Sequence, residues 1–188
     1  MTSSQHTIRD KTLFTNEVDG DLHISWDTYN KAIEDLAVQI FESGYEFNQI
    51  VCIAKGGLRV GDILARIFDV PFAVMSVESY HGDGAKDTQG KIVFGNSLAK
   101  TSPNLGNKVL LVDDLADSGV TLEKCVRWLE HYEGFFIDDL HTATVWVKGK
   151  SEFTPDYYIE YLPNNPWIHQ PFEKYETMDI EELQGESK

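Results

Sequence analysis

The chain has 188 residues, enough for one domain with a buried core, and its 41% hydrophobic and 12% aromatic residues are typical of a globular protein. Its formal net charge of −15 argues against nucleic acid as a partner, because phosphate backbones require clustered Lys and Arg. No apolar run approaches the roughly 20 residues that span a bilayer, and residues 1–11 contain no hydrophobic signal segment. Cys52 and Cys125 are expected to be small buried side chains, and we expect a cytoplasmic protein.

Hydrophobic periodicity predicts alternating helices and strands along the chain. Ser25 or Asp27 can cap a first helix that runs to Ser43 and ends at Gly44. The elements expected after it are, in chain order, a strand at 50–54, a helix at 59–68, a strand at 72–77, a polar loop at 82–90, a returning strand at 91–94, a strand at 108–112, a helix at 121–132, and strands at 142–147 and 157–161.

This alternation predicts an α/β fold, a mostly parallel twisted sheet flanked by helices. We expect a single domain over 1–188 with a core at about 22–173, and tails at 1–20 and 174–188. The acidic residues between Glu173 and Glu186 indicate a solvated, poorly ordered run. Ligands of parallel sheets bind beyond the carboxyl ends of the strands, where the loops after Ala54 and Val112 must lie.

The stretch from Val109 to Thr121 combines a buried strand, an acidic pair and a loop of small or hydroxylic residues that leads into a helix. A helix N-terminus presents unpaired amides and partial positive charge, so this loop is a natural phosphate site. Asp117, Ser118 and Thr121 could equally be an ordinary helix cap. Asp113 and Asp114 favour the functional interpretation, because adjacent carboxylates at a strand end are costly unless they bind hydroxyls, a metal or cations. Together these features indicate a sugar phosphate.

Other phosphate and catalytic motifs fail on their residues. Gly56 to Gly61 has the glycine spacing of a P-loop, but Asp62 and Ile63 replace the required Lys and Ser/Thr. Gly82-Asp83-Gly84 lacks the third glycine of a dinucleotide fingerprint. Hydrolase and zinc signatures are absent from the sequence.

The 13 residues from Val109 resemble the phosphoribosyl pyrophosphate (PRPP) motif of type I phosphoribosyltransferases. Further segments resemble the bacterial xanthine-guanine group of that family, in the same chain order, over roughly residues 22–173. They are Ile24-Ser25-Trp26-Asp27, Ala54-Lys55-Gly56-Gly57-Leu58, Ser79-Tyr80, Val147-Lys148 and Trp167-Ile168-His169-Gln170-Pro171-Phe172. The resemblance implies the family fold with a small hood over the base site. It also implies transfer of ribose 5-phosphate from PRPP to a purine, release of pyrophosphate, and a requirement for Mg2+.

The resemblance assigns a role to each segment that binds PRPP. Asp113 and Asp114 would hold the ribose hydroxyls or the metal, directly or through water. Lys55-Gly56-Gly57 would bind pyrophosphate, with a candidate cis peptide bond before Lys55, although this tripeptide could also be a plain strand-to-helix turn. The 5-phosphate would be wrapped by Ala116, Asp117, Ser118, Gly119, Val120 and Thr121.

The resemblance also places the purine. Asp117 would accept the proton that the base loses, or stabilise developing charge. Lys148 would donate to the 6-oxygen of guanine, xanthine or hypoxanthine, although a lysine that ends a strand is otherwise usually solvated. Trp167 would stack on the base and Ile168 would offer backbone contacts, whereas a hydrophobic plug is the alternative for Trp167.

Ser79 and Tyr80, with the loop at 82–90, resemble the family's mobile lid, although any exposed loop has such a composition.

Three residues depart from the family pattern. His169 replaces an acid, Val120 a small residue and Lys55 an arginine. The first of these leaves the purine preference open.

The leading hypothesis is therefore a purine salvage enzyme acting on a 6-oxopurine. The alternatives are a PRPP-binding regulator without catalysis and a phosphoribosyltransferase for a different base. PRPP and a purine base are the expected partners, and the family suggests a homodimer or homotetramer.

Overall fold

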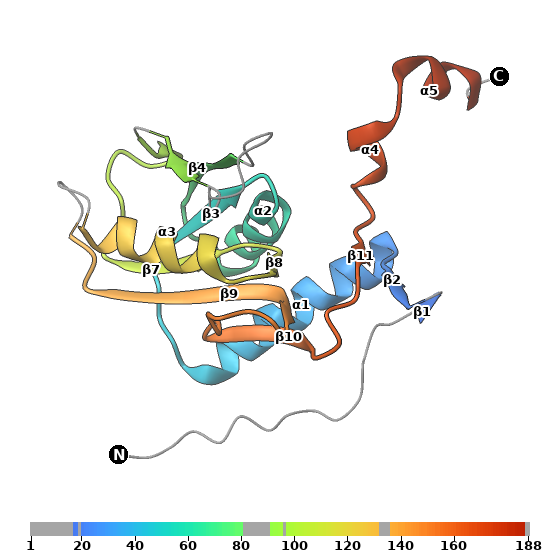
Figure 1. Cartoon of the computed structure of the whole chain (residues 1–188). Coiled ribbons are helices and arrows are strands. Elements are labelled where there is room, and N and C mark those ends of the chain that lie inside the picture. Colours follow the sequence, from blue (N-terminus) through green and yellow to red (C-terminus); the bar gives the residue numbers. More distant parts are fainter. Residues whose placement is uncertain (1–16, 19, 81–90, 96, 132–135, 187–188) are drawn as a thin grey trace. The chain divides into compact units, whose positions relative to one another are not determined.

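The computed structural model describes residues 17–18, 20–80, 91–95, 97–131 and 136–186 (Figure 1). The chain divides into two compact units, the larger at 31–165 and the smaller formed by 1–30 and 166–188. None of the helices within the described ranges is long and apolar enough to cross a membrane.

The larger unit is built on a sheet whose strands follow the order β10-β9-β7-β3-β4-β5, with β6 beside β4 and β8 beside β9. The pairs along β10-β9-β7-β3-β4 are parallel, and β5 and β6 are antiparallel to β4. The prediction of a mostly parallel α/β sheet is therefore confirmed. The strands are β3 (Gln49–Ala54), β4 (Phe72–Tyr80), β5 (Lys91–Phe94), β6 (Ala99–Lys100), β7 (Lys108–Val112), β8 (Leu115–Ala116), β9 (Asp139–Lys148) and β10 (Tyr157–Leu162).

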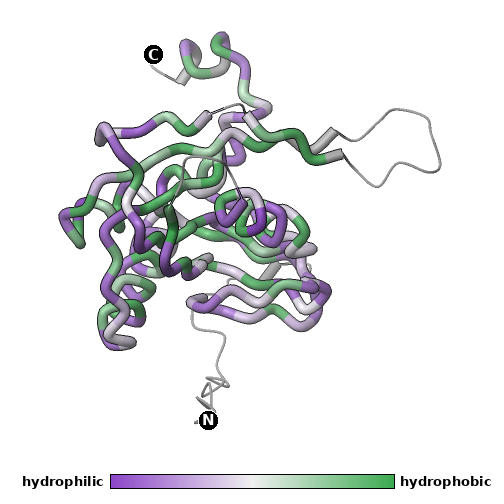
Figure 2. Tube along the Cα trace, turned by 90° about the vertical axis from the view of Figure 1, so that its left-hand side faces the viewer, coloured by the Kyte–Doolittle hydropathy of each residue, from purple (hydrophilic) through white to green (hydrophobic). Residues whose placement is uncertain are grey.

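Two helices cover opposite faces of this sheet. Leu122, Cys125 and Leu129 of α3 (Val120–His131) pack in one cluster with Val51 and Ile53 of β3. Successive residues of a strand point to opposite faces, so Cys52 points away from the face of Val51 and Ile53. Gly61 of α2 (Gly57–Phe68) lies against Cys52, and α2 therefore covers the opposite face. Figure 2 shows the hydrophobic colour gathered along extended segments of the chain. Both cysteines are buried as predicted, and burial raises the pKa of each thiol to about 12.

Helix α1 (Trp26–Ser43) begins in the smaller unit and continues into the larger one. The backbone N–H of Thr28 donates to Ser25 Oγ at 3.1 Å, which confirms the predicted cap. Gly44 follows the helix with φ of +76°, a conformation that glycine adopts without strain.

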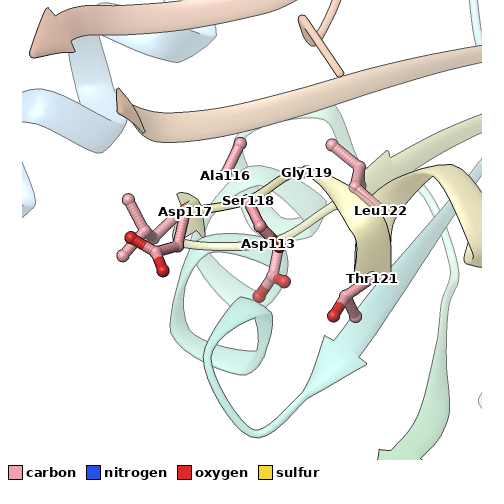
Figure 3. Close-up of a pocket in the computed structure, with 8 residues that line it drawn as sticks. Asp113, Ala116, Asp117, Ser118, Gly119, Thr121 and Leu122 are labelled. Atoms are coloured by element: carbon pink, nitrogen blue, oxygen red, sulfur yellow. The ribbon is translucent and has the colours of Figure 1, made fainter. Parts of the chain in front are cut away.

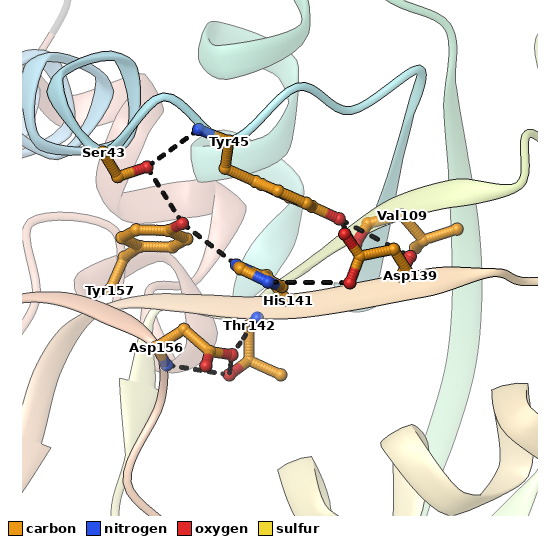
Figure 4. A network of polar contacts seen from close by, with 8 residues as sticks. All are labelled: Ser43, Tyr45, Val109, Asp139, His141, Thr142, Asp156 and Tyr157. Carbon is orange, nitrogen blue, oxygen red and sulfur yellow. Dashed lines mark hydrogen bonds and ion pairs between the residues drawn. The ribbon is translucent and has the colours of Figure 1, made fainter. Parts of the chain in front are cut away.

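A polar network lies where β9 begins (Figure 4). The hydroxyl of Tyr157 shares hydrogen bonds with Ser43 Oγ and His141 Nδ1, each at 3.0 Å. Tyr45 stacks on the His141 ring and donates to the carbonyl oxygen of Val109 at 3.0 Å. The network therefore links the end of α1 with the neighbouring strands β7, β9 and β10.

The smaller unit contains a three-stranded sheet of β1 (Glu17–Val18), β2 (Asp21–His23) and β11 (Ile168–His169). Sequence analysis did not predict these strands, because two or three residues are too few to show periodicity. Trp26, Tyr29 and Phe172 form an aromatic cluster beside this sheet. The acidic segment that we predicted to be poorly ordered instead forms two short helices, α4 (Lys174–Thr177) and α5 (Ile180–Glu186).

Candidate active site

Two of the predicted segments meet at the carboxyl ends of β3 and β7, which pair in parallel with Cys52 opposite Val112. Gly56, two residues beyond β3, lies directly against the acidic pair that follows β7. A Cβ atom at Gly56 would overlap the Asp114 carboxylate and would lie 2.9 Å from Asp113 Oδ1. Only glycine permits this approach. The peptide bond between Ala54 and Lys55 is cis, as the resemblance suggested.

The acidic pair is compact and partly buried. The backbone N–H of Asp114 donates to Asp113 Oδ1 at 3.0 Å, and the N–H of Asp113 donates to the carbonyl oxygen of Ala143 at 3.1 Å. Burial, followed by the charge of Asp114, raises the pKa of Asp113 well above its ordinary value. A cation or hydroxyl donors at this position would relieve the repulsion between the two carboxylates.

The loop after β8 forms a pocket, shown in Figure 3. Gly119 adopts a φ of +77° and leads into α3, whose first amides have no partner within the helix. Ser118 Oγ is 3.4 Å from the N–H of Val120, a long cap contact. The residues that line the pocket are Asp113, Leu115, Ala116, Asp117, Ser118, Gly119, Thr121 and Leu122.

Asp117 forms ion pairs with two lysines. Its Oδ1 lies 2.8 Å from Lys148 Nζ and its Oδ2 lies 2.9 Å from Lys150 Nζ. Burial raises the pKa of Asp117, but the hydrogen bonds and charges of both lysines outweigh this effect, and the net pKa lies below that of an ordinary aspartate. The carboxylate is therefore ionised at neutral pH.

Lys148 is not the solvated residue of the alternative interpretation, because its side chain is only 7% exposed. Lys150 was missed by sequence reasoning. The signal available for it was the second lysine in Lys148-Gly149-Lys150, but nothing local indicates that both side chains reach the same carboxylate.

Comparisons with known proteins show the family of the chain. The phosphoribosyl transferase domain family matches residues 25–177. The chain belongs to this family. It is 32% identical over 160 residues to a xanthine-guanine phosphoribosyltransferase of Ruegeria sp., covering 80% of this chain and 84% of that relative. The enzyme of the same name from Roseobacter denitrificans is 31% identical over the same shares of both chains.

Solved structures show the same fold. A purine phosphoribosyltransferase from Pyrococcus horikoshii aligns with a TM-score of 0.68 and 25% identity, over 85% of this chain and 98% of that one. A xanthine-guanine-hypoxanthine phosphoribosyltransferase from Helicobacter pylori aligns with a TM-score of 0.65 and 20% identity, over 88% of this chain and 98% of that one. The type I phosphoribosyltransferase fold expected from the sequence is therefore confirmed.

The remaining predicted residues of this phosphoribosyltransferase lie in two places. Ser79 and Tyr80 end β4, opposite Ile92 and Lys91 of β5, and the proposed lid at 82–90 lies outside the described residues. In the smaller unit Trp167 is 60% exposed, so it does not form the buried plug of the alternative interpretation. Ile168 is buried in β11.

The side chain of His169, the departure from the family pattern, is held within the smaller unit. Its ring stacks on His23 with centroids 4.3 Å apart, and its Nε2 lies 3.2 Å from Asp21 Oδ2. His23 and His169 are direct partners in the parallel register of β2 and β11.

Proposed function

We propose that this phosphoribosyltransferase moves ribose 5-phosphate from PRPP to a 6-oxopurine and releases pyrophosphate. The observation that carries the proposal is a single pocket lined by Asp113, by Asp117 and by the loop that opens α3. It joins a carboxylate suited to hydroxyls or cations, amides suited to a phosphate, and a carboxylate that is ion-paired with a buried lysine.

The loop at 116–121 binds the 5-phosphate in this proposal. The amides at the start of α3 and the positive end of its dipole attract an anion despite the formal net charge of −15. Gly119 allows the turn, because its φ of +77° is unfavourable for other residues. Thr121 adds a hydroxyl donor at the pocket wall.

Asp113 and Asp114 hold the ribose hydroxyls and Mg2+, directly or through water. Their side chains fit this ion, which proteins bind through one or two carboxylates while substrate oxygens and water complete the shell. Among the described residues no group of three His, Cys, Asp or Glu side chains is placed to hold a metal ion. Held by these two carboxylates, Mg2+ would supply positive charge to offset the negative charge of the leaving pyrophosphate.

Lys55, Gly56 and Gly57 bind the pyrophosphate in this proposal. The packing of Gly56 on the carboxylates brings this turn next to the ribose site. Backbone amides that approach closely and the charge of Lys55 are the groups that a pyrophosphate requires.

The base lies where Asp117 and Lys148 can contact it. Lys148 donates to the 6-oxygen, a contact that adenine cannot make because its 6-amino group is a donor. Asp117 accepts a hydrogen bond from the N–H of the imidazole ring of the base and stabilises the positive charge that develops on the ribose. Because its pKa is lowered, Asp117 acts mainly through its charge. The contacts that the family resemblance assigns to Trp167 and Ile168 remain predictions.

Product analysis tests this function directly. The protein is incubated with PRPP and Mg2+ and with guanine, xanthine, hypoxanthine, adenine or uracil, and nucleotide and pyrophosphate are followed. We expect turnover with 6-oxopurines and none with adenine or uracil. PRPP binding without turnover of any base would overturn the enzyme proposal in favour of a regulator.

Two variants test the assigned roles. Asp117→Asn is expected to lower kcat while PRPP binding persists, because the variant loses charge at the reacting centre. Asp113→Asn combined with Asp114→Asn is expected to abolish PRPP binding, measured by calorimetry. Wild-type kinetics in either variant would contradict the role assigned to the residue that was changed.

The assembly into a homodimer or homotetramer and the cytoplasmic location remain predictions.

A further inference from the structure

Lys150 contacts the Asp117 carboxylate, and neither the family resemblance nor the proposed function assigns it a role. Its Nζ lies 2.9 Å from Asp117 Oδ2, while Nζ of Lys148 lies 2.8 Å from Oδ1. Each lysine therefore holds one oxygen of the same carboxylate. Lys148 is buried and ends β9, whereas the half-exposed Lys150 belongs to the turn that follows.

The turn that carries Lys150 is anchored to the segment after β10. The backbone N–H of Lys150 donates to Asn165 Oδ1 at 2.7 Å. A Cβ atom at Gly149 would lie 2.6 Å from the carbonyl oxygen of Pro163, so the residue between the two lysines must be small. The backbone position of Lys150 is thus determined independently of its ion pair.

The same turn is also tied to the loop that carries Asp117. The backbone N–H of Glu152 donates to the carbonyl oxygen of Ser118 at 3.0 Å. A Cβ atom at Gly119 would lie 2.6 Å from Ser151 Oγ, which shows how closely the two segments approach. These backbone contacts hold Lys150 and Asp117 at a separation that the lysine side chain spans.

We propose that Lys150 is a positioning residue for Asp117, whose Oδ2 it holds while Lys148 donates to the incoming base. The inference rests on the proposed function, in which Lys148 contacts the base. An ammonium group that binds a second acceptor holds the first one less firmly, and a carboxylate held at one oxygen only is free to rotate. Lys150 keeps the second oxygen in place, and it reaches the reaction only through Asp117.

Three variants separate this role from a general effect of charge. Lys150→Met removes the ion pair, Lys150→Arg keeps it, and Lys31→Met removes an exposed ion pair with Asp35 on α1 as the matched control. We expect Lys150→Met to lower kcat about tenfold, with KM for PRPP and for the base within about twofold of the wild type. We expect Lys150→Arg to restore most of kcat and Lys31→Met to match the wild type.

A double variant tests whether Lys150 acts through Asp117. In an Asp117→Asn background Lys150→Met should have no further effect on kcat, because the carboxylate that it positions is gone. Additive losses would overturn the proposal, and so would equal kinetics of Lys150→Met and Lys31→Met. A raised KM for PRPP with unchanged kcat would also overturn it and would assign Lys150 to the donor.

A measurement without turnover distinguishes failure of this inference from failure of the proposed function. The chemical shift of the Asp117 carboxyl carbon is followed by NMR against pH in the wild type and in Lys150→Met. The pKa of the Asp117 carboxyl group should be higher in the variant, because a cation beside it has been removed. An unchanged titration would refute the Lys150 contact. This holds even if the wild-type protein transfers ribose 5-phosphate to none of the bases, the result that would refute the proposed function alone.

Discussion

Glu160 is a buried carboxylate with no hydrogen-bond partner for either side-chain oxygen among the described residues. The residue is 7% exposed and lies on β10 opposite the fully buried Trp146 of β9. Burial raises the pKa of Glu160 from 4.5 to about 7. Replacing Glu160 by Gln removes the ionisable group and keeps the shape of the side chain.

The sign of the effect follows from proton linkage. Below pH 4.5 the carboxyl group is protonated in both the folded and the unfolded protein, so it has no pH-dependent effect. Between 4.5 and about 7 the unfolded chain loses its proton first, and folding stability falls as the pH rises. The full shift corresponds to about 3 kcal/mol, which partial solvent screening reduces to about 2 kcal/mol.

Urea unfolding of the wild type, Glu160→Gln and the exposed control Glu42→Gln at pH 5 and pH 8.5 measures this effect. Relative to the wild type, Glu160→Gln should gain about 2 kcal/mol of unfolding free energy between the two pH values, whereas Glu42→Gln should gain none. Any cost of burying the amide is the same at both pH values and cancels. If Glu160→Gln changes the unfolding free energy equally at pH 5 and pH 8.5, burial does not raise the pKa of Glu160 and the reasoning is wrong.

Two further predictions concern the phosphate loop and the polar network. Gly119→Ala should weaken PRPP binding about tenfold or more in calorimetry, because φ is +77° and a Cβ atom would lie 2.6 Å from the backbone nitrogen of Phe153. Unchanged affinity would show that the loop tolerates another conformation. Tyr157→Phe should lower the unfolding free energy by about 1 kcal/mol, because Ser43 and His141 each lose a hydrogen bond. Tyr161→Phe, at a 48% exposed position of the same strand, is the control, and equal effects of the two variants would contradict the role of the network.

Much of the fold could be predicted because its information is local. The continuous apolar runs at 50–54 and 108–112 and the stripe of the first helix match β3, β7 and α1 closely, since burial on one or two faces leaves a periodic pattern. The strands β2 and β11 leave no such pattern. They form because residues more than a hundred positions apart in the chain pair in register, and no local rule predicts that pairing.

The sequence by itself predicted the donor chemistry, because the strand, the acidic pair and the proposed phosphate loop are contiguous between Val109 and Thr121. Only the tertiary structure showed that Gly56 packs on those carboxylates and that Lys148 and Lys150 both reach Asp117. The physical reason is that a helix start or a buried strand is specified by neighbouring residues. The partner of a charged side chain instead depends on the strand order and loop contacts of the whole sheet.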